Sequence, residues 1–246
     1  MRLLKNLFLP LICWFWFFQV HAQSNHLRIL SYNVRNAKGM DGQVNYDRVA
    51  SVIKKASPTV VALQELDSAT VRSGGKDVLK EIADRVGMEY SFGASIDFNG
   101  GKYGIGILSQ EKPLHLTRIP LPGKEEKRSL LIAEFPGYFF CCTHFSLTPE
   151  DQVRSAKIIN EQIERFNKPV YLAGDFNSIP DAESIRILSD KWYLLSGKAY
   201  TFPSDKPDRC IDYIFTREKK MKSLQMKIIP EAMASDHRPV FVEVRN

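Results

Sequence analysis

Short apolar segments recur along most of the chain, and many of them end in a small group of polar residues. Residues 27–33 (LRILSYN) and 59–63 (TVVAL) are typical of buried strands, because continuous apolar runs of this length suit a strand that is covered on both faces. The sequence Asn99-Gly100-Gly101 predicts a turn between two neighbouring strands. Further strands are predicted over residues 90–96, 104–109, 114–119, 129–135, 138–144, 169–173, 210–216, 224–229 and 239–244.

Helical spacing occurs in fewer segments, and each of them lies between predicted strands. Helices are predicted over residues 46–56, 78–86, 148–166 and 181–188. Thr148 is expected to cap the third of these helices, and Gly87 is expected to end the second. Strands outnumber helices, and single helices connect them. The pattern therefore predicts a mixed α/β (α+β) sandwich with sheets inside and helices outside.

The first residues have a different pattern. Arg2 and Lys5 precede an apolar run over residues 7–20, and Ala22-Gln23 follows it. This order is typical of a secretory signal peptide, since the apolar run is too short to cross a bilayer comfortably. We expect a signal peptide over residues 1–22 and one domain over residues 23–246, exported to the periplasm or the extracellular space. An uncleaved membrane anchor is the alternative.

Composition and charge narrow the class of protein only slightly. The 246 residues are 44% hydrophobic and 25% charged, which excludes a disordered or fibrous chain. The net charge of +6 falls to +4 when the signal peptide is removed, which is compatible with a polyanionic partner without requiring one. Three cysteines then remain: Cys141, Cys142 and Cys210. We expect them to be core residues, and a disulfide of Cys210 stays open.

Polar side chains at the ends of predicted strands are the candidate chemical groups. They are Asn33, Glu65, His144, Asp175 with Asn177, Asp212, and Asp236 with His237. A group at the end of a rigid strand can be held with the accuracy that catalysis needs. The segments SYNVRN and AGDFNS both end apolar strands in an asparagine-containing cluster. We therefore hypothesise that these two clusters face each other across paired sheets.

The residue types favour phosphoryl chemistry with a hard cation. Glu65 and Asn33 offer oxygen atoms of the kind that Mg²⁺ binds. Asp175 and Asn177 lie at positions i and i+2, so in an extended segment their side chains point the same way; a simple turn is the alternative. Asp212 is expected to pair with an imidazole. A zinc motif, a glycine-rich nucleotide loop and a GxSxG elbow are absent from the sequence.

The order of these motifs resembles the endonuclease/exonuclease/phosphatase superfamily, in particular a secreted bacterial-type member that is deoxyribonuclease I-like. The resemblance runs from about residue 27 to residue 244, and GDFN followed by SDH is its most specific part. It rests on SYN (31–33), QE (64–65), YGIGILS (103–109), THF (143–145), GDFN (174–177), IDYIF (211–215) and SDHRPV (235–240).

The resemblance implies a four-layer αββα sandwich and a division of roles among the candidate residues. Glu65 would be the principal ligand of Mg²⁺, for which Mn²⁺ could substitute, with Asn33 and Asp236 nearby. Asp175 would position or activate the attacking water. The scissile phosphate would be bound by Asn177, His144 and His237, with Asp212 orienting His237. Arg128 and Tyr103 are expected on the substrate side.

The expected activity is that of an exported Mg²⁺-dependent phosphoesterase, which hydrolyses a phosphodiester or a phosphomonoester through in-line attack of water. DNA or RNA, a phospholipid head group, and a sugar or inositol phosphate remain as substrate classes. Asp67 follows Glu65 by two positions, where nuclease-type relatives often carry arginine, and this weakens a DNA-groove interpretation. A secreted, non-catalytic binding module on the same fold is the alternative. No stable protein partner is implied, and we expect a monomer.

Overall fold

The computed structural model describes residues 26–245. The predicted signal peptide, residues 1–22, lies outside the described residues. Within residues 26–245, no helix is both long enough and apolar enough to span a membrane.

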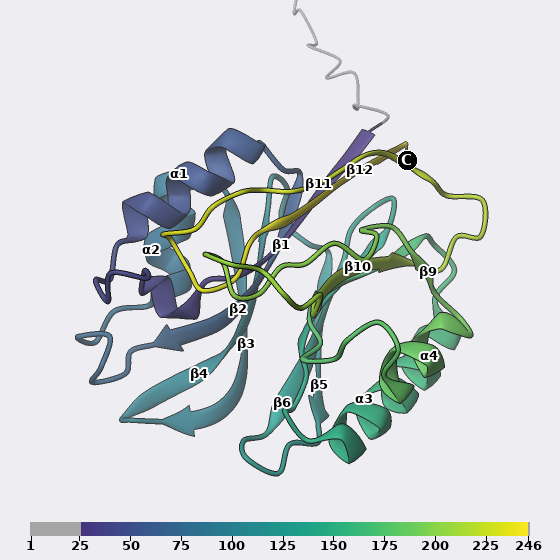
Figure 1. The fold of residues 1–246 in the computed structure, drawn as a ribbon, viewed down its shortest axis with the longest axis horizontal. Coiled ribbons are helices and arrows are strands. Elements are labelled where there is room, and N and C mark those ends of the chain that lie inside the picture. The colour runs from purple at the N-terminus through teal and green to yellow at the C-terminus, as the bar shows by residue number, and fades with distance from the viewer. Residues whose placement is uncertain (1–25, 246) are drawn as a thin grey trace, which may run out of the picture.

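Two six-stranded sheets form the centre of the molecule, and each contains one parallel pair of strands (Figure 1). The first sheet has the order β11 (Ser223–Ile228), β12 (Val240–Arg245), β1 (His26–Asn33), β2 (Val60–Ser68), β4 (Gly101–Ser109), β3 (Glu89–Phe98). The second has the order β5 (His115–Leu121), β6 (Arg128–Glu134), β7 (Phe139–His144), β8 (Val170–Asp175), β10 (Asp212–Thr216), β9 (Tyr193–Leu194). The parallel pairs are β1–β2 and β7–β8, and all other neighbours are antiparallel.

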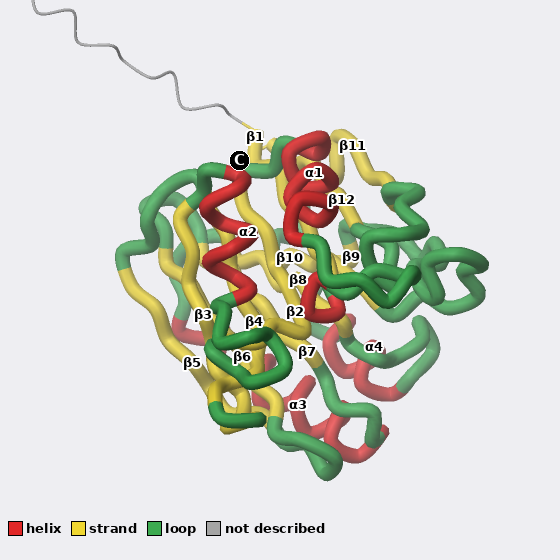
Figure 2. The backbone as a smooth tube through the Cα atoms, turned by 90° about the vertical axis from the view of Figure 1, so that its left-hand side faces the viewer, coloured by secondary structure: helices red, strands yellow, loops and turns green. Residues whose placement is uncertain are grey.

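Helices cover the outer faces of both sheets. Seen from outside, α1 (Tyr46–Ala56) and α2 (Val78–Val86) lie in front of the first sheet (Figure 2). On the second sheet lie α3 (Pro149–Gln162), which continues as a short 3₁₀ turn, and α4 (Glu183–Ser189). The predicted four-layer sandwich is therefore confirmed.

Alternation of side chains along each strand supplies three separate hydrophobic layers. On β1, Ile29 packs between the two sheets, whereas its neighbour Leu30 packs under α1 and α2. On β7, Cys142 faces the space between the sheets and Cys141 faces α3 and α4. Successive side chains of a strand point to opposite faces, so a strand covered on both faces must be apolar throughout. The cysteines of residues 26–245 are all free and buried, which agrees with their expected core role.

The two parallel pairs place the candidate residues at one end of the sandwich. Asn33 at the end of β1 is in register with Gln64 of β2, and His144 at the end of β7 is in register with Asp175 of β8. In both pairs a helix returns the chain, so both strands end on the same edge. The strand ends of the two sheets meet there: Asn33 Nδ2 donates to Asp175 Oδ2 at 3.0 Å. This confirms the hypothesis that the two asparagine-containing clusters face each other.

Some boundaries differ from those the sequence predicts. The β2 strand continues to Ser68, because its pairing with β4 resumes at Leu66 after a register shift between Leu63 and Leu66. Glu65 lies in this irregularity. The third helix ends at Gln162 instead of residue 166, and the hydroxyl of Thr148 donates to Glu125 instead of capping the helix. The two-residue strand β9 was not predicted, since two residues carry no periodic signal.

Candidate active site

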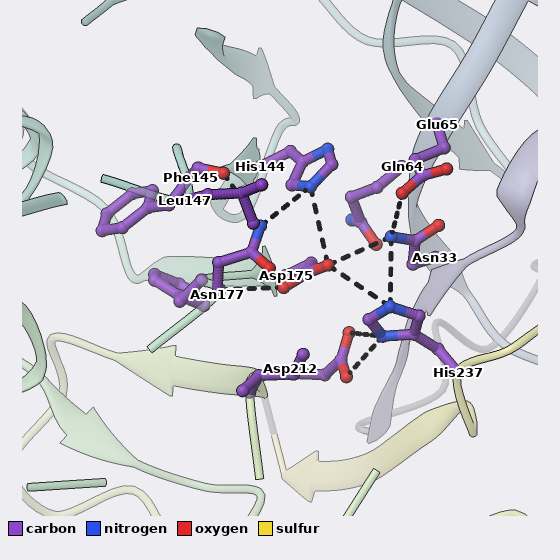
Figure 3. Close-up of polar contacts among 12 residues, drawn as sticks. Asn33, Gln64, Glu65, His144, Phe145, Leu147, Asp175, Asn177, Asp212 and His237 are labelled. Carbon is purple, nitrogen blue, oxygen red and sulfur yellow. Dashed lines mark hydrogen bonds and ion pairs between the residues drawn. The ribbon is translucent and has the colours of Figure 1, made fainter. Parts of the chain in front are cut away.

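Asp175 lies at the centre of the site and is shared by groups from both sheets (Figure 3). Its Oδ2 accepts from Asn33 Nδ2 at 3.0 Å and lies 3.5 Å from His144 Nε2 and 3.6 Å from His237 Nε2. Its Oδ1 accepts from the backbone N–H of Asn177 at 2.9 Å. Burial raises the pKa of Asp175 above its ordinary value, and the charge of His237 and these hydrogen bonds oppose that shift.

His237 lies between two carboxylates. Its Nδ1 is 2.9 Å from Asp212 Oδ2, and Asp212 also accepts from Thr201 Oγ1 at 2.6 Å. Burial alone would lower the pKa of His237, but Asp212 and Asp175 outweigh it and raise the pKa to about 10. The ring is therefore an imidazolium at neutral pH, with Nδ1–H directed at Asp212 and Nε2–H on the side of Asp175.

His144 has the opposite protonation state although it lies in the same site. Burial and the positive charges of Arg128 and His237 hold its pKa well below the ordinary value. Arg128 Nη1 lies 3.1 Å from His144 Nδ1, while His144 Nε2 lies 3.2 Å from Asn177 Nδ2 and 3.5 Å from Asp175 Oδ2. His144 is thus a neutral imidazole whose Nε2 edge points into the site.

Asn177 reaches the site through a turn. Its φ angle is +47° and β8 ends at Asp175, so the segment turns here, which is the alternative that the sequence left open to an extended segment. The bond from its backbone N–H to Asp175 Oδ1 closes the turn. Its Nδ2 donates to the carbonyl of Phe145 at 3.0 Å and lies 3.2 Å from His144 Nε2. The side chains of Asp175 and Asn177 both reach the site, as predicted, but a turn brings them there instead of an extended segment.

Phe176, between the two, faces away into the core beneath the second sheet. It packs edge-on against Phe145, Tyr213 and Phe215. This anchor fixes the turn that carries the polar residues on either side.

Two of the predicted metal ligands, Asn33 and Glu65, lie on the first-sheet side of Asp175. Asn33 Nδ2 also donates to Glu65 Oε1 at 3.0 Å, while Asn33 Oδ1 accepts from the backbone N–H of Arg35. Glu65 has a φ angle of +60°, a strained conformation of the kind found at functional sites. Asp236 is partly exposed and lies 3.4 Å from Arg35 Nε.

These donors fit a hard divalent cation. Carboxylate and amide oxygens are the ligands that Mg²⁺ prefers. Gln64, next to Glu65, adds a buried side-chain oxygen that has no hydrogen-bond partner within residues 26–245 (Figure 3). A buried acceptor without a partner is costly, and a bound cation or its water would supply one.

A second group of ligand atoms lies in the same site. One atom from each of Asp175, Asp212 and His237 falls within 4.8 Å of the others, which is close enough to hold a metal ion. The imidazolium state of His237 disfavours ligation there, because a histidine must be neutral to bind a metal.

The two predicted substrate-side residues have different surroundings. Arg128 is only 6% exposed, and besides His144 it contacts Glu126 at 2.6 Å, so it lies behind His144 and supports it. Tyr103 lies near Phe98 with the guanidinium of Arg72 5.5 Å from its ring centre. Burial raises the pKa of Tyr103, and the charge of Glu65 adds to the effect.

Two residues that support the site, Thr201 and Ser235, were not among the candidates from the sequence. Thr201 holds Asp212, and Ser235 Oγ donates to the backbone carbonyl of Asn33 at 2.7 Å. Ser235 could have been suggested by its place in SDHRPV, whereas Thr201 lies in a loop without any motif.

The family model described as "Endonuclease/Exonuclease/phosphatase family" matches residues 30–237. The chain therefore belongs to the endonuclease/exonuclease/phosphatase family. Members of this family are metal-dependent phosphoesterases, and this chain has the phosphoesterase fold together with the buried Asp–Asp–His group.

Solved structures show the same fold at low sequence identity. A family protein from Beutenbergia cavernae DSM 12333 has a TM-score of 0.72 at 21% identity, covering 89% of this chain and 71% of that one. A mannosyl-6-phosphatase from Bacteroides thetaiotaomicron VPI-5482 has a TM-score of 0.72 at 20% identity, covering 89% and 99%. D. rerio TDP2, complexed with a single-strand DNA product, has a TM-score of 0.71 at 23% identity, covering 90% and 99%. No curated protein sequence matches the chain.

Replacing Arg128 with glutamine should raise the pKa of His144, because it removes a positive charge that disfavours the imidazolium. The pKa should stay below the ordinary histidine value, since burial remains. The measurement is an NMR pH titration of the histidine Cε1–H resonances. Lys157→Gln, an exposed change on α3, serves as the control and should leave the His144 titration unchanged. An unchanged His144 titration would show that Arg128 does not control this ring.

Proposed function

We propose that the protein is an exported Mg²⁺-dependent phosphoesterase that hydrolyses a phosphate ester by in-line attack of water. The observation that carries this proposal is the arrangement around Asp175: a buried carboxylate lies against Asn33 on one side and against two histidines in opposite protonation states on the other. Titratable groups whose surroundings separate their pKa values are characteristic of acid–base sites.

Glu65, Asn33 and Asp236 are proposed to hold the cation. When bound, Mg²⁺ supplies positive charge to the phosphate oxygens and to the leaving oxygen. The partner-less oxygen of Gln64 and the strained backbone of Glu65 support this location. The Asp175–Asp212–His237 group would then serve in proton transfer instead of metal binding.

Asp175 is the proposed base. Its Oδ2 faces both histidines, and its raised pKa makes it a stronger proton acceptor than an ordinary aspartate. A water held at Oδ2 would transfer its proton there as its oxygen attacks phosphorus, while the bond from phosphorus to the ester oxygen breaks and that oxygen takes a proton from solvent. Asn33 Nδ2, which donates to the same oxygen, fixes the direction of this carboxylate.

Three donors are proposed to stabilise the charge that develops on the phosphoryl oxygens. His237 offers an N–H of an imidazolium, His144 offers an N–H of a neutral imidazole, and Asn177 offers its amide. Each is positioned before substrate arrives, His237 by Asp212, His144 by Arg128 and Asn177 by the carbonyl of Phe145. Donors that need no rearrangement during the reaction contribute most to rate.

The similar structures support both a phosphodiester and a phosphomonoester as the substrate. The name of one similar structure is that of a phosphatase acting at a mannosyl-6-phosphate, and another was solved with a single-strand DNA product. DNA or RNA, a phospholipid head group, and a sugar or inositol phosphate therefore all belong in a substrate panel. The alternative is a non-catalytic binding module. Turnover of any member of this panel would exclude it, and no turnover would support it.

Purified protein should hydrolyse p-nitrophenyl phosphate or bis-p-nitrophenyl phosphate with Mg²⁺ and lose that activity in EDTA. Asn177→Ala should lower kcat by about 10²–10³-fold, because one donor to the developing charge is lost. Its circular dichroism spectrum should be unchanged. Gln162→Ala, at the end of α3, is the control and should retain full activity. Absence of metal-dependent turnover with these esters, DNA and phospholipids would support the binding module instead.

Glu65→Gln should raise the Mg²⁺ concentration needed for half-maximal activity by at least about tenfold, since a neutral amide is a weaker ligand for Mg²⁺ than a carboxylate. The measurement is activity against Mg²⁺ concentration, repeated with Mn²⁺. Glu161→Gln, an exposed change on α3, is the matched control. An unaltered Mg²⁺ dependence in Glu65→Gln would move the ion away from Glu65, toward the Asp–Asp–His group.

Export is proposed on the basis of the N-terminal sequence alone, in which a basic start, an apolar run and Ala22-Gln23 occur in order. N-terminal sequencing of protein recovered from the exported fraction should begin at or near Gln23. Recovery of a chain that still begins with residues 1–22 would support the uncleaved anchor.

A further inference from the structure

A basic pocket of about 430 Å³ lies beside Glu65, on the side of the first sheet. One wall is formed by the segment that follows β1, with Arg35 and Lys38, and the other by the loop that follows β2, with Arg72. The lining contains three cationic residues, two from the first segment and one from the second, and one acidic residue, Glu65. A pocket with this charge is suited to an anion, and it opens beside the proposed metal ligand.

Arg72 is held rigidly in the pocket wall. Its Nε donates to Asp67 Oδ2 at 2.7 Å and its Nη2 donates to Asp67 Oδ1 at 2.9 Å, while the guanidinium lies 4.6 Å from the ring centre of Phe98. Asp67 is fully buried, whereas the side chain of Arg72 is 47% exposed. The remaining N–H groups of a guanidinium fixed in this way can bind an anion with little loss of conformational freedom.

The opposite wall is fixed to the same carboxylate. Asn36 Nδ2 donates to Asp67 Oδ2 at 2.9 Å, and the backbone N–H of Asp67 donates to Asn36 Oδ1 at 3.1 Å. Arg35, Asn36 and Ala37 have φ angles of +46°, +55° and +57°, which is costly for residues with a Cβ. This strained turn keeps Arg35 beside the pocket, so both cationic walls are arranged before any ligand arrives.

We propose that this pocket binds a second phosphate group of the same ester whose first phosphate is hydrolysed at Asp175. The inference rests on the proposed function and deepens it, because it names the substrate class: a phosphate ester that carries a further phosphate close to the scissile one. Arg72 and Lys38 bind that second phosphate, and Asp67 is a positioning residue that acts through Arg72. Asp67 occupies the position at which nuclease-type relatives often carry arginine. It binds Arg72, so the arginine of this pocket comes from the loop that follows β2.

The test compares matched esters that differ by one phosphate. Thymidine monophosphate is compared with thymidine bisphosphate, and inositol monophosphate with inositol bisphosphate, so that nucleotide and cyclitol sources are distinguished. In at least one pair, KM for the bisphosphate should be about tenfold lower than KM for the monophosphate, with kcat similar.

Two variants should remove this preference. The double variant Asp67→Asn with Arg72→Gln replaces both partners, so that no unpaired charge is left buried, and should bring the KM ratio close to one. Lys38→Gln changes only an exposed side chain and should reduce the ratio about two- to threefold. Both should leave the monophosphate kinetics within about twofold of wild type. Lys157→Gln, an exposed lysine on α3, is the control and should change nothing.

Equal KM values for mono- and bisphosphates in both pairs, unaffected by either variant, would overturn the second-phosphate site and leave the proposed function standing. If none of these esters is hydrolysed, turnover of the p-nitrophenyl esters, DNA and phospholipids decides the proposed function, and calorimetry with Mg²⁺ and the mono- and bisphosphates decides the site. Tighter binding of a bisphosphate that is lost in the double variant supports the site; equal binding of both esters overturns it.

Discussion

The whole site depends on a single buried carboxylate that must be paired by groups from both sheets. Asp175 is 1% exposed and stands at the place where the ends of β1 and β8 meet. A buried carboxylate without partners would cost several kcal/mol, so its hydrogen bonds to Asn33 and to the backbone of Asn177 are needed for stability as well as for chemistry. The bond to Asn33 also joins the two sheets at this edge.

Two histidines on either side of this carboxylate are set to opposite states by their partners. His237 lies against Asp212 and Asp175 and is held protonated, while His144 lies against Arg128 and is held neutral. Burial lowers the pKa of both rings, so the difference comes from the neighbours: the charges of Asp212 and Asp175 and the hydrogen bond to Asp212 raise the pKa of His237, whereas the charges of Arg128 and His237 lower that of His144. The site thus contains a cationic imidazolium and a neutral imidazole on either side of one carboxylate.

Much of the fold and most of the candidate residues could be predicted from sequence because both leave local signals. An apolar run followed by a polar residue marks Asn33, His144 and Asp175, and the motifs give their order. Pairings between distant segments leave no such signal: the support of His144 by Arg128 and the capture of Arg72 by Asp67 depend on how strands and loops pack. The sequence suggested Arg128 as a substrate-side residue, and only the packing reveals its contact with His144.

The position of β12 in the first sheet has a consequence for folding. This strand is the last in sequence among residues 26–245, yet it lies in the interior of the sheet, hydrogen-bonded to β1. Asn33 and His237, which lie 3.5 Å apart at the site, are separated by 204 positions in sequence. Such non-local contacts form late and slowly, since the loop closure must precede any gain. A chain in which β12 has not yet paired with β1 therefore carries every residue of the site without an assembled site.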